Sequence, residues 1–243
     1  MTVNYEYSYT KKDKFIFVQN AFGIRIGTEI LDFVAKSVSF PAYYFHYQDG
    51  GHVAAIHRHL NNAYFFKIDY KNFFYSISRN RVAAALHDAG HPRARTFAKW
   101  SCVRNPIKNG LRYALPIGFV QSPALATMAL MRTNVANVLD QAGAKGVYVS
   151  VYLDDLIGSG NDPAAVQEVF DELIEASKTA NLQISPKKLV APCTSLIAFN
   201  CDLSNGKADV TADRRADFYS IARSAFSADA FEKYCDTVSA NNI

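Results

Sequence analysis

The feature that most constrains the fold is residues 147–160, with the sequence VYVSVYLDDLIGSG. Valines alternate with polar or aromatic residues over its first six positions, and an apolar run follows the pair Asp154-Asp155 before two glycines close the segment. Alternation with period two indicates a half-buried strand, and an interruption between two such runs indicates a hairpin. We therefore predict two strands whose turn carries two adjacent carboxylates.

The two carboxylates at this turn repel each other, which favours a bound cation. Mg²⁺ suits such a site because it binds through one or two carboxylates together with substrate phosphates. A solvated Asp-Asp turn is the alternative, so the prediction needs support from another part of the chain.

A second part of the chain supplies a further carboxylate, Asp69. It lies near the exit of the aromatic and β-branched run of residues 64–77, which predicts a strand. Asp69, followed by Phe73-Phe74 and Ser76-Ile77, resembles the first catalytic motif of reverse transcriptases. The segment Tyr152-Leu-Asp-Asp155 resembles their second.

Residues 115–126, LPIGFVQSPALA, lie between these motifs and are similar to a Leu-Pro-x-Gly…Ser-Pro-x-Leu segment of the bacterial branch of that family. That branch holds the retron, group II intron and phage-defence enzymes. The resemblance implies an α+β fold with the fingers and palm of a right-hand polymerase. The palm would be of the split βαβ type, with an antiparallel sheet and helices on one face.

The resemblance also implies three parts. Fingers are expected over residues 1–63, with part of 78–114 returning to them, a palm over 64–212, and a short C-terminal helical segment over 213–243. The last part offers about one helix where relatives carry a thumb of several, so the thumb is expected to be absent or reduced. Because polymerases hold the duplex with the thumb, we expect that a partner protein, a bound RNA or a second copy of the chain helps to hold it, or that the chain makes short products.

Local patterns predict the main elements. A fingers hairpin is expected from a strand over 14–18, a turn over 20–23 and a returning strand over 24–26. Two short strands are expected within 195–210, turning at Asn205-Gly206. Helices are expected over 28–38, 52–60, 79–89 and 122–141, with a further one opening at Asp162-Pro163.

The resemblance assigns the metal site. Asp69 and Asp154 are expected to bridge two Mg²⁺ ions, for which Mn²⁺ can substitute, and the Tyr70 carbonyl is expected to complete a site. Asp155 is a weaker ligand candidate that mainly raises the local negative field. Two metals about 4 Å apart stabilise both the attacking and the leaving oxygen of phosphoryl transfer.

The nucleotide-binding residues follow from the same resemblance. Arg25, in Gly23-Ile-Arg25, is expected to meet the triphosphate, for which a guanidinium is well suited. The Phe74 ring falls at the sugar-gating position, where it would exclude a 2′-hydroxyl. Lys188 ends a loop resembling the fourth motif and could protonate departing pyrophosphate. Core packing is the alternative for Phe74, and a solvated surface is the alternative for Arg25 and Lys188.

Two positions on the templating side depart from the family pattern. Ile117 stands where many relatives have Gln, and Gln121 replaces the Thr or Gly common before Ser-Pro. Gln121 and Tyr70 complete the set expected to contact nucleotide. Because neither departure touches the metals, we expect the metal chemistry to survive and template use to be altered.

Composition fits an ordinary soluble protein of 243 residues with a formal net charge of +4, which permits nucleic-acid binding without indicating it. No stretch approaches the roughly 20 apolar residues that span a membrane. The N-terminus lacks the apolar core of a signal peptide. The four cysteines are scattered, which favours free thiols in a reducing cytoplasm.

The resemblance to reverse transcriptases implies an RNA-directed DNA polymerase in a bacterial defence or retroelement system. Its expected partners are an RNA template or non-coding RNA, the DNA product, deoxynucleoside triphosphates, and either further copies of the chain or a second protein. DNA synthesis without an ordinary template is one alternative. A catalytically idle palm that binds RNA or assists assembly is another, which the presence of all three carboxylates disfavours. Template, primer and biological trigger stay open.

Overall fold

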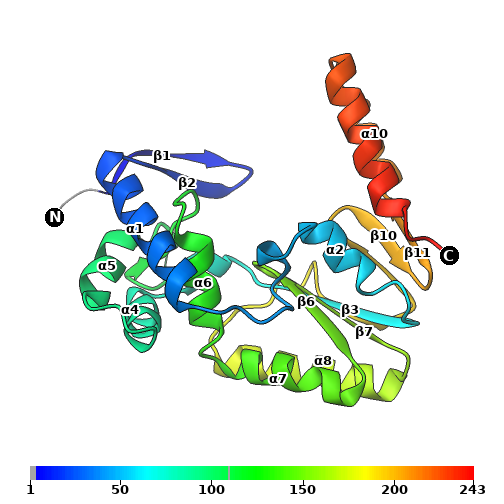
Figure 1. The fold of residues 1–243 in the computed structure, drawn as a ribbon, viewed down its shortest axis with the longest axis horizontal. Helices are drawn as coiled ribbons and strands as arrows, with labels where there is room; N and C mark the ends of the chain where they lie inside the picture. The colour runs from blue at the N-terminus through cyan, green and yellow to red at the C-terminus, as the bar shows by residue number, and fades with distance from the viewer. Residues whose placement is uncertain (1–3, 109) are drawn as a thin grey trace. The chain divides into compact units, whose positions relative to one another are not determined.

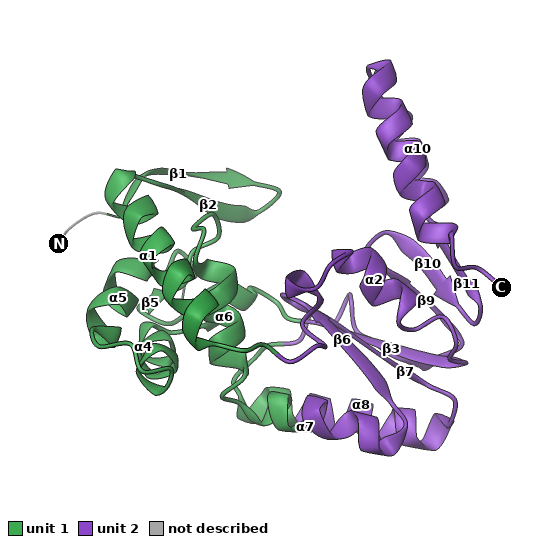
Figure 2. Cartoon of the chain, in the orientation of Figure 1, with its two compact units in different colours: residues 1–40, 70–137, 176–183 green, residues 41–69, 138–175, 184–243 purple. Residues whose placement is uncertain are grey.

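The structure is a computed structural model that describes residues 4–108 and 110–243. The chain folds into two compact units, coloured separately in Figure 2. Unit 1 comprises residues 1–40, 70–137 and 176–183, and unit 2 comprises residues 41–69, 138–175 and 184–243. This division does not follow the predicted fingers and palm, because residues 41–63 share unit 2 with the predicted palm strands. The fingers and palm boundaries stay a prediction.

Unit 1 is mainly helical. Its elements are β1 (Tyr5–Lys11), β2 (Lys14–Gln19), α1 (Ala21–Ser37), α3 (Phe73–Ser76), α4 (Arg79–Asp88), α5 (Ala94–Ser101), β4 (Val103–Arg104), β5 (Tyr113–Ala114) and α6 (Ser122–Leu130). Helices α7 (Asn134–Ala142) and α8 (Pro163–Thr179) each begin in one unit and end in the other. Figure 1 labels β1, β2, α1, α4, α5, α6, α7 and α8.

Unit 2 is built on two antiparallel sheets. One has the strand order β6-β7-β3-β8 and the other the order β11-β10-β9. The strands are β3 (Tyr64–Asp69), β6 (Tyr148–Tyr152), β7 (Asp155–Gly160), β8 (Val190–Cys193), β9 (Ser195–Ala198), β10 (Cys201–Ser204) and β11 (Lys207–Val210). The remaining elements of the unit are the 3-10 turns Phe45–Tyr47 and Gly143–Lys145 and the helices α2 (Gly51–His57), α9 (Ala212–Tyr219) and α10 (Ala225–Ser239).

The two faces of the four-stranded sheet are covered differently. On one face Phe66 of β3 meets Phe170 of α8, with ring centroids 5.4 Å apart. On the other face Phe65 and Ile157 share a core cluster with Ile56 of α2 and with residues of the three-stranded sheet. The predicted antiparallel palm sheet and its long covering helix are confirmed. The prediction that helices lie on one face only needs correction, since α2 packs on the opposite face.

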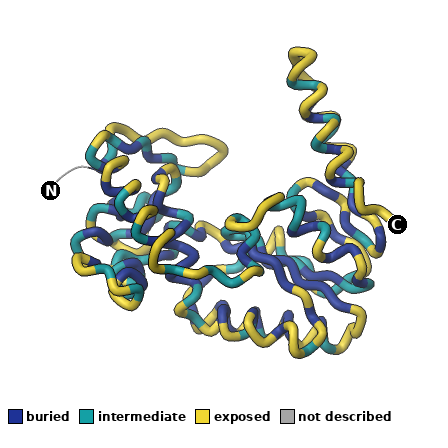
Figure 3. The backbone as a smooth tube through the Cα atoms, in the orientation of Figure 1, coloured by how far each residue is buried: buried dark blue, intermediate teal, exposed yellow. Residues whose placement is uncertain are grey.

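The predicted hairpin over residues 147–160 is confirmed. Tyr152 pairs with Asp155, which leaves Leu153 and Asp154 as its turn. Leu153 has a φ of 58°, a left-handed conformation that costs a branched side chain about 1–2 kcal/mol. Figure 3 shows how deeply the strands of this sheet are buried.

The hairpin expected over residues 14–26 is wrong in its second half. Strand β2 instead pairs with the preceding β1, and Asn20 opens helix α1 by accepting a hydrogen bond from the Gly23 backbone N–H at 2.9 Å. Asn favours both turns and helix N-caps, and the buried Ile26 and Ile30, four residues apart, settle the choice through packing.

Three further boundaries differ from the predictions. The strand expected over 64–77 ends at Asp69, and one helical turn, α3, follows. The helix expected over 122–141 is broken between α6 and α7, where the Thr133 hydroxyl and backbone N–H both donate to the Leu130 carbonyl. The segment 195–210 holds three strands, because a turn at Phe199-Asn200, both with positive φ, precedes the predicted one.

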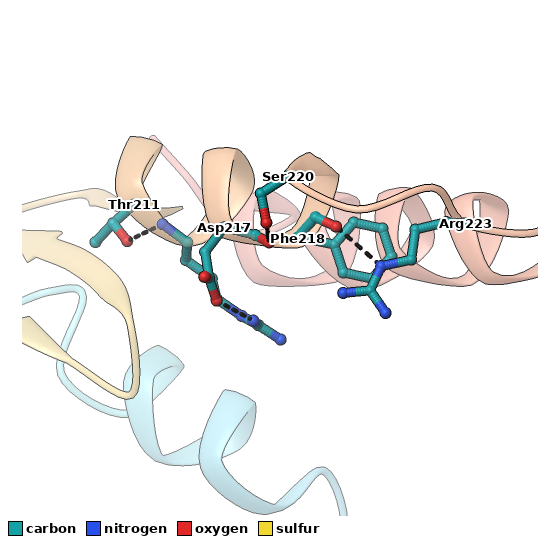
Figure 4. A network of polar contacts seen from close by, with 6 residues as sticks. Thr211, Asp217, Phe218, Ser220 and Arg223 are labelled. Atoms are coloured by element: carbon teal, nitrogen blue, oxygen red, sulfur yellow. Dashed lines mark hydrogen bonds and ion pairs between the residues drawn. The ribbon is translucent and has the colours of Figure 1, made fainter. Parts of the chain in front are cut away.

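The C-terminal segment contains two helices where one was expected. Thr211 caps the first turn of α9, and after that helix the Arg223 guanidinium donates to the Phe218 carbonyl at 2.9 Å (Figure 4). The Ser220 hydroxyl donates to the Asp217 carbonyl at 2.8 Å. These bonds close α9 and let the chain reverse into α10, whose Phe231 stacks on Phe218 at 3.9 Å between centroids.

Two expectations about the surroundings of the chain can be compared with the structure. All four cysteines are free thiols, as predicted. Within the described part of the chain, each helix is too short or too polar to cross a bilayer.

Candidate active site

The strands of unit 2 bring the three predicted carboxylates together at one end of the four-stranded sheet. Asp69, the last residue of β3, lies directly opposite Asp155, the first residue of β7. Side chains directly opposite across antiparallel strands have Cβ atoms about 4.5–5.5 Å apart. Asp154 occupies the adjoining turn, so a single hairpin and its neighbouring strand assemble the acidic group.

Lys188 contacts this acidic group. Its Nζ lies 2.7 Å from Asp69 Oδ2, and the Asp69 side chain is only 3% exposed while that of Lys188 is 55% exposed. The hydrogen bond to Asp69 and the charges of Asp69, Asp155 and Asp154 hold the pKa of Lys188 above its ordinary value. Lys188 is therefore a protonated ammonium at neutral pH. The predicted residue lies at the predicted site, and its role in proton transfer stays a prediction.

The loop after α8 positions Lys188 through its backbone. The Ser185 N–H donates to the Asp69 carbonyl at 2.8 Å, and the Ser185 carbonyl accepts from the Lys188 N–H at 3.0 Å. The loop is thereby fastened to the end of β3, next to the carboxylate that its lysine contacts.

Lys67 is a site residue that the sequence reasoning missed. Its Nζ lies 3.2 Å from Asp155 Oδ1, with the two side chains 14% and 25% exposed. Lys67 precedes Asp69 by two residues on the same strand, so the two side chains share one face of the sheet. That spacing was visible in the sequence, but the partner Asp155 depended on the register between β3 and β7.

The acidic group fits a cation that keeps part of its coordination for water or substrate. Among the described residues, no cluster of three or more His, Cys, Asp or Glu side chains is arranged to enclose a metal by itself. Carboxylate oxygens are hard donors, and Mg²⁺ commonly binds through one or two of them plus substrate phosphates. The strained turn at Leu153, which presents Asp154, is the kind of feature that concentrates at functional sites.

A cavity of about 780 Å³ within unit 2 opens beside the acidic group. Lys67, Asp155 and Lys188 lie on its wall, and Arg214 adds a further cation. Its aromatic lining residues are His52, Tyr152, Phe199, Phe218, Phe231 and Tyr234. Aromatic faces beside cations form the kind of surface on which nucleic-acid bases stack while phosphates are held.

Two predicted nucleotide-binding residues, Tyr70 and Phe74, belong to unit 1. Phe74 is half-buried, and its ring centroid lies 5.6 Å from that of the buried Phe73. The Tyr70 hydroxyl lies 2.9 Å from Ser177 Oγ, and burial raises the pKa of Tyr70 to about 12. The Tyr70 side chain is thus part of the core, and the predicted use of its carbonyl stays a prediction.

Gln121 and Arg25 do not have the surroundings expected for them. Gln121 is fully buried and bonds to Gln19 at 3.1 Å and to Ser101 at 3.3 Å, which favours a structural role. Arg25 lies in α1, not on a hairpin, and its guanidinium pairs with Glu29 four residues on at 3.2 Å. The hairpin on which the Arg25 contact was predicted is therefore replaced by a helix, and the nucleotide contacts of Arg25 and Gln121 stay predictions.

Unit 1 contains a polar cavity of about 790 Å³ that the sequence did not reveal. Lys71, Arg81 and Lys108 line it together with hydroxyl and amide side chains, and none of the described residues on its wall is Asp or Glu. Asn72 and Asn181, with φ values of 54° and 51°, lie on its rim. Burial lowers the pKa of Arg81, so its charge is partly desolvated. Such a wall favours an anion.

Comparison with known proteins identifies the family. The family described as reverse transcriptase (RNA-dependent DNA polymerase) matches residues 14–210. Retron Ec86 reverse transcriptase of Escherichia coli is 27% identical over 132 residues, which cover 54% of this chain and 38% of that protein. The Gag-Pro-Pol polyprotein of Mason-Pfizer monkey virus is 28% identical over 122 residues, covering 50% of this chain and 6% of the polyprotein.

Solved structures share the fold. A foamy viral protease-reverse transcriptase bound to double-stranded DNA superposes with a TM-score of 0.53 at 16% identity, over 90% of this chain and 32% of that one. Telomerase from Candida albicans, in complex with a fragment of telomeric RNA, gives a TM-score of 0.53 at 10% identity, over 74% and 37%. The fingers-and-palm fold predicted from the motifs is confirmed. The chain spans well under half the length of each of these relatives.

The family match extends over most of the chain and includes the strand of Asp69, the Asp154-Asp155 hairpin and the loop of Lys188. The chain belongs to the reverse transcriptase (RNA-dependent DNA polymerase) family.

Proposed function

We propose that this chain catalyses metal-dependent transfer of deoxynucleotides to a primer 3′ end on an RNA template. The observation that carries the proposal is the cross-strand placement of Asp69 opposite Asp155, with Asp154 in the adjoining turn. Three carboxylates at the same end of a sheet repel each other. Binding of divalent cations between them would relieve that repulsion.

Asp69 and Asp154 would hold the cations, Mg²⁺ or in its place Mn²⁺. When bound, a pair of such ions stabilises the negative charge that develops on the attacking and leaving oxygens. Asp69 suits this role because β3 and the Ser185 backbone fix its position. Lys188 is protonated and largely exposed, so it can turn from Asp69 toward departing pyrophosphate and donate a proton.

Two further surfaces support a phosphate-bearing substrate. The cavity beside Asp155 offers aromatic faces and Arg214, and the cavity of unit 1 offers three cations, with no carboxylate among the described residues that line it. Phosphate recognition in proteins relies on Arg and Lys of this kind.

The decisive experiment is primer extension by Asp154→Asn protein with Mg²⁺ or Mn²⁺. Incorporation should fall to background while circular dichroism and the unfolding midpoint stay close to wild type, since the altered side chain lies in a turn. Asp202→Asn is the matched control, because Asp202 is an exposed carboxylate on β10 of the same unit. Full incorporation by folded Asp154→Asn protein would exclude the proposed metal site.

Sugar selection tests the role of Phe74. Phe74→Val should raise the ratio of ribonucleotide to deoxynucleotide incorporation, because a smaller side chain leaves room for a 2′-hydroxyl. The substitution also removes buried surface at a cost of about 1–3 kcal/mol, so the ratio within one variant is the relevant measure. An unchanged ratio would show that Phe74 only packs against Phe73.

We further infer a role in a bacterial retroelement or antiviral defence system, with a structured RNA and either further copies of the chain or a second protein as partners. Similarity to a retron reverse transcriptase supports this inference. Sequencing the nucleic acid that copurifies with the protein tests it. Random cellular RNA without an enriched species would argue against a dedicated template.

A further inference from the structure

The acidic group of unit 2 contains a like-charge pair that the strand register makes unavoidable. Asp69 and Asp155 face each other directly across β3 and β7, and like charges in that position destabilise a sheet. Each carboxylate forms an ion pair with a different lysine: Asp69 with Lys188, and Asp155 with Lys67.

The two lysines are held in different ways. Lys188 is 55% exposed on the loop after α8 and has room to swing into solvent. Lys67 is only 14% exposed and rises from the middle of β3. It stands opposite Ile157 in the register, so its ammonium reaches Asp155 diagonally, across one strand and two residues along. Lys67 is therefore the more buried of the two lysines, and its backbone is fixed within the sheet by both neighbouring strands.

Asp155 depends on this contact. Its Oδ1 is buried and has no hydrogen-bond partner among the described residues. The Lys67 ammonium, 3.2 Å away, forms an ion pair with it. A buried carboxylate oxygen without a counter-charge is costly, and pairs of low exposure are screened only weakly by salt. The contact therefore balances the charge of Asp155 in this structure.

We propose that Lys67 is a positioning residue that keeps Asp155 out of the cation's ligand set, which leaves Asp69 and Asp154 to hold the cation. Lys188 is the exchangeable counter-charge, which gives up Asp69 when a cation arrives, whereas Lys67 stays in place. This assignment rests on the proposed function and refines the division of labour within its site.

Binding of Mn²⁺ alone, measured by titration calorimetry on the full chain, tests the assignment. With Lys67 intact, Asp154→Asn should weaken Mn²⁺ binding at least tenfold and Asp155→Asn by no more than about twofold. In the Lys67→Met background Asp155 is released, so Mn²⁺ should bind more tightly than to wild type. In that background Asp155→Asn should weaken binding at least fivefold. Lys67→Arg, which keeps the charge, should behave as wild type.

Thermal unfolding of the metal-free protein provides a readout without metal. Lys67→Met should lower the unfolding midpoint by about 4 °C or more, because it leaves the buried Oδ1 of Asp155 without its counter-charge. The double variant Lys67→Met/Asp155→Asn should recover most of that loss. Strictly additive shifts would contradict the coupling between the two side chains.

The outcomes separate this inference from the proposed function. Equal loss of Mn²⁺ affinity in Asp154→Asn and Asp155→Asn, with Lys67 intact, would overturn the role of Lys67 and leave the metal site standing. Unchanged affinity in both Asp69→Asn and Asp154→Asn would overturn the proposed metal site itself.

Discussion

Two polar clusters lie on the same face of the four-stranded sheet of unit 2, and they are balanced in different ways. Near one end His59 bonds through its two ring nitrogens to Ser159 Oγ at 2.6 Å and to Ser150 Oγ at 2.8 Å. At the other end Asp69 and Asp155 face each other. The register places Ser150, Ser159 and both aspartates on the same side of the strands.

The His59 cluster is closed and neutral. His59 is fully buried, burial lowers its pKa to about 3, and Asn62 completes the cluster by donating to Ser159 Oγ at 2.8 Å. Each group has its partner within the cluster, so there is no position at which a ligand would improve the balance. Such a network holds β6, β7 and the segment before β3 in one arrangement.

The aspartate cluster is charged and partly open. It relies on two ammonium groups for its balance, and one of them, Lys188, is largely exposed. Under the proposed function, a cation takes over the contact that Lys188 makes with Asp69 in this structure. The difference indicates that a buried polar cluster on this sheet face need not be a binding site, and that the partly exposed, charged cluster is the better candidate for one.

The largest expected effect contrasts Asp69→Asn with Ser159→Ala. Metal sites contribute several kcal/mol of transition-state stabilisation, so Asp69→Asn should lower primer extension by about 10³-fold. Ser159→Ala should change the rate per folded molecule by less than about twofold, because the hydroxyl belongs to the closed cluster. Single-turnover incorporation, corrected for the folded fraction, measures both. A comparable loss of rate in Ser159→Ala would remove the distinction between the two clusters.

The second effect is on stability. His59→Leu removes the partner of two buried serine hydroxyls and should lower the free energy of unfolding by about 2–3 kcal/mol. Urea unfolding at neutral pH measures the change. His87→Leu is the control, since the His87 side chain is 82% exposed and should shift the value by less than about 0.5 kcal/mol. A His59→Leu protein as stable as wild type would show that the network does not hold the sheet.

The smallest effect is the pH dependence that His59 adds. An unfolded histidine takes up its proton near pH 6.5, whereas folded His59 stays neutral down to about pH 3. The unfolded state then binds one more proton, so this part of the stability is complete above about pH 6.5 and falls as the pH falls. The loss approaches about 1.4 kcal/mol per pH unit.

Comparison with His59→Asn isolates that contribution from the titration of carboxylates. The difference in unfolding free energy between wild type and the variant should shrink by about 1.4 kcal/mol as the pH falls from 5.5 to 4.5. Urea unfolding at a series of pH values measures it. If the difference stayed constant with pH, the pKa of His59 in the folded protein would be close to its ordinary value, and the predicted lowering would be wrong.

Much of the candidate site was predictable because its chemistry lies in local patterns. Period-two alternation on both sides of Asp154-Asp155 is sufficient for a hairpin, and the structure confirms it. The pattern around Asp69 likewise predicted a strand with the carboxylate near its exit. The turn at Asn205-Gly206 was predictable for the same reason, since its residue types suit one backbone conformation.

Predictions failed where one residue type serves two structures. Asn20 suits a turn as well as a helix N-cap, and only the packing of Ile26 and Ile30 against the rest of unit 1 decides for the helix. The break at Thr133 is likewise not visible in the sequence. Every residue of α6 except Pro123 is buried, so the helix has no exposed polar face whose end would mark the break.

The sequence by itself determined which carboxylates this protein carries, the hairpin that presents two of them and the existence of a strand that contains the third. Only the tertiary structure decided that Asp69 faces Asp155, that Lys67 and Lys188 balance them, and that His59 closes a neutral cluster farther along the same face. Spacing within one strand is a local property of the chain. The partner across a strand depends on register, and register is set by the burial of whole faces, which no local pattern contains.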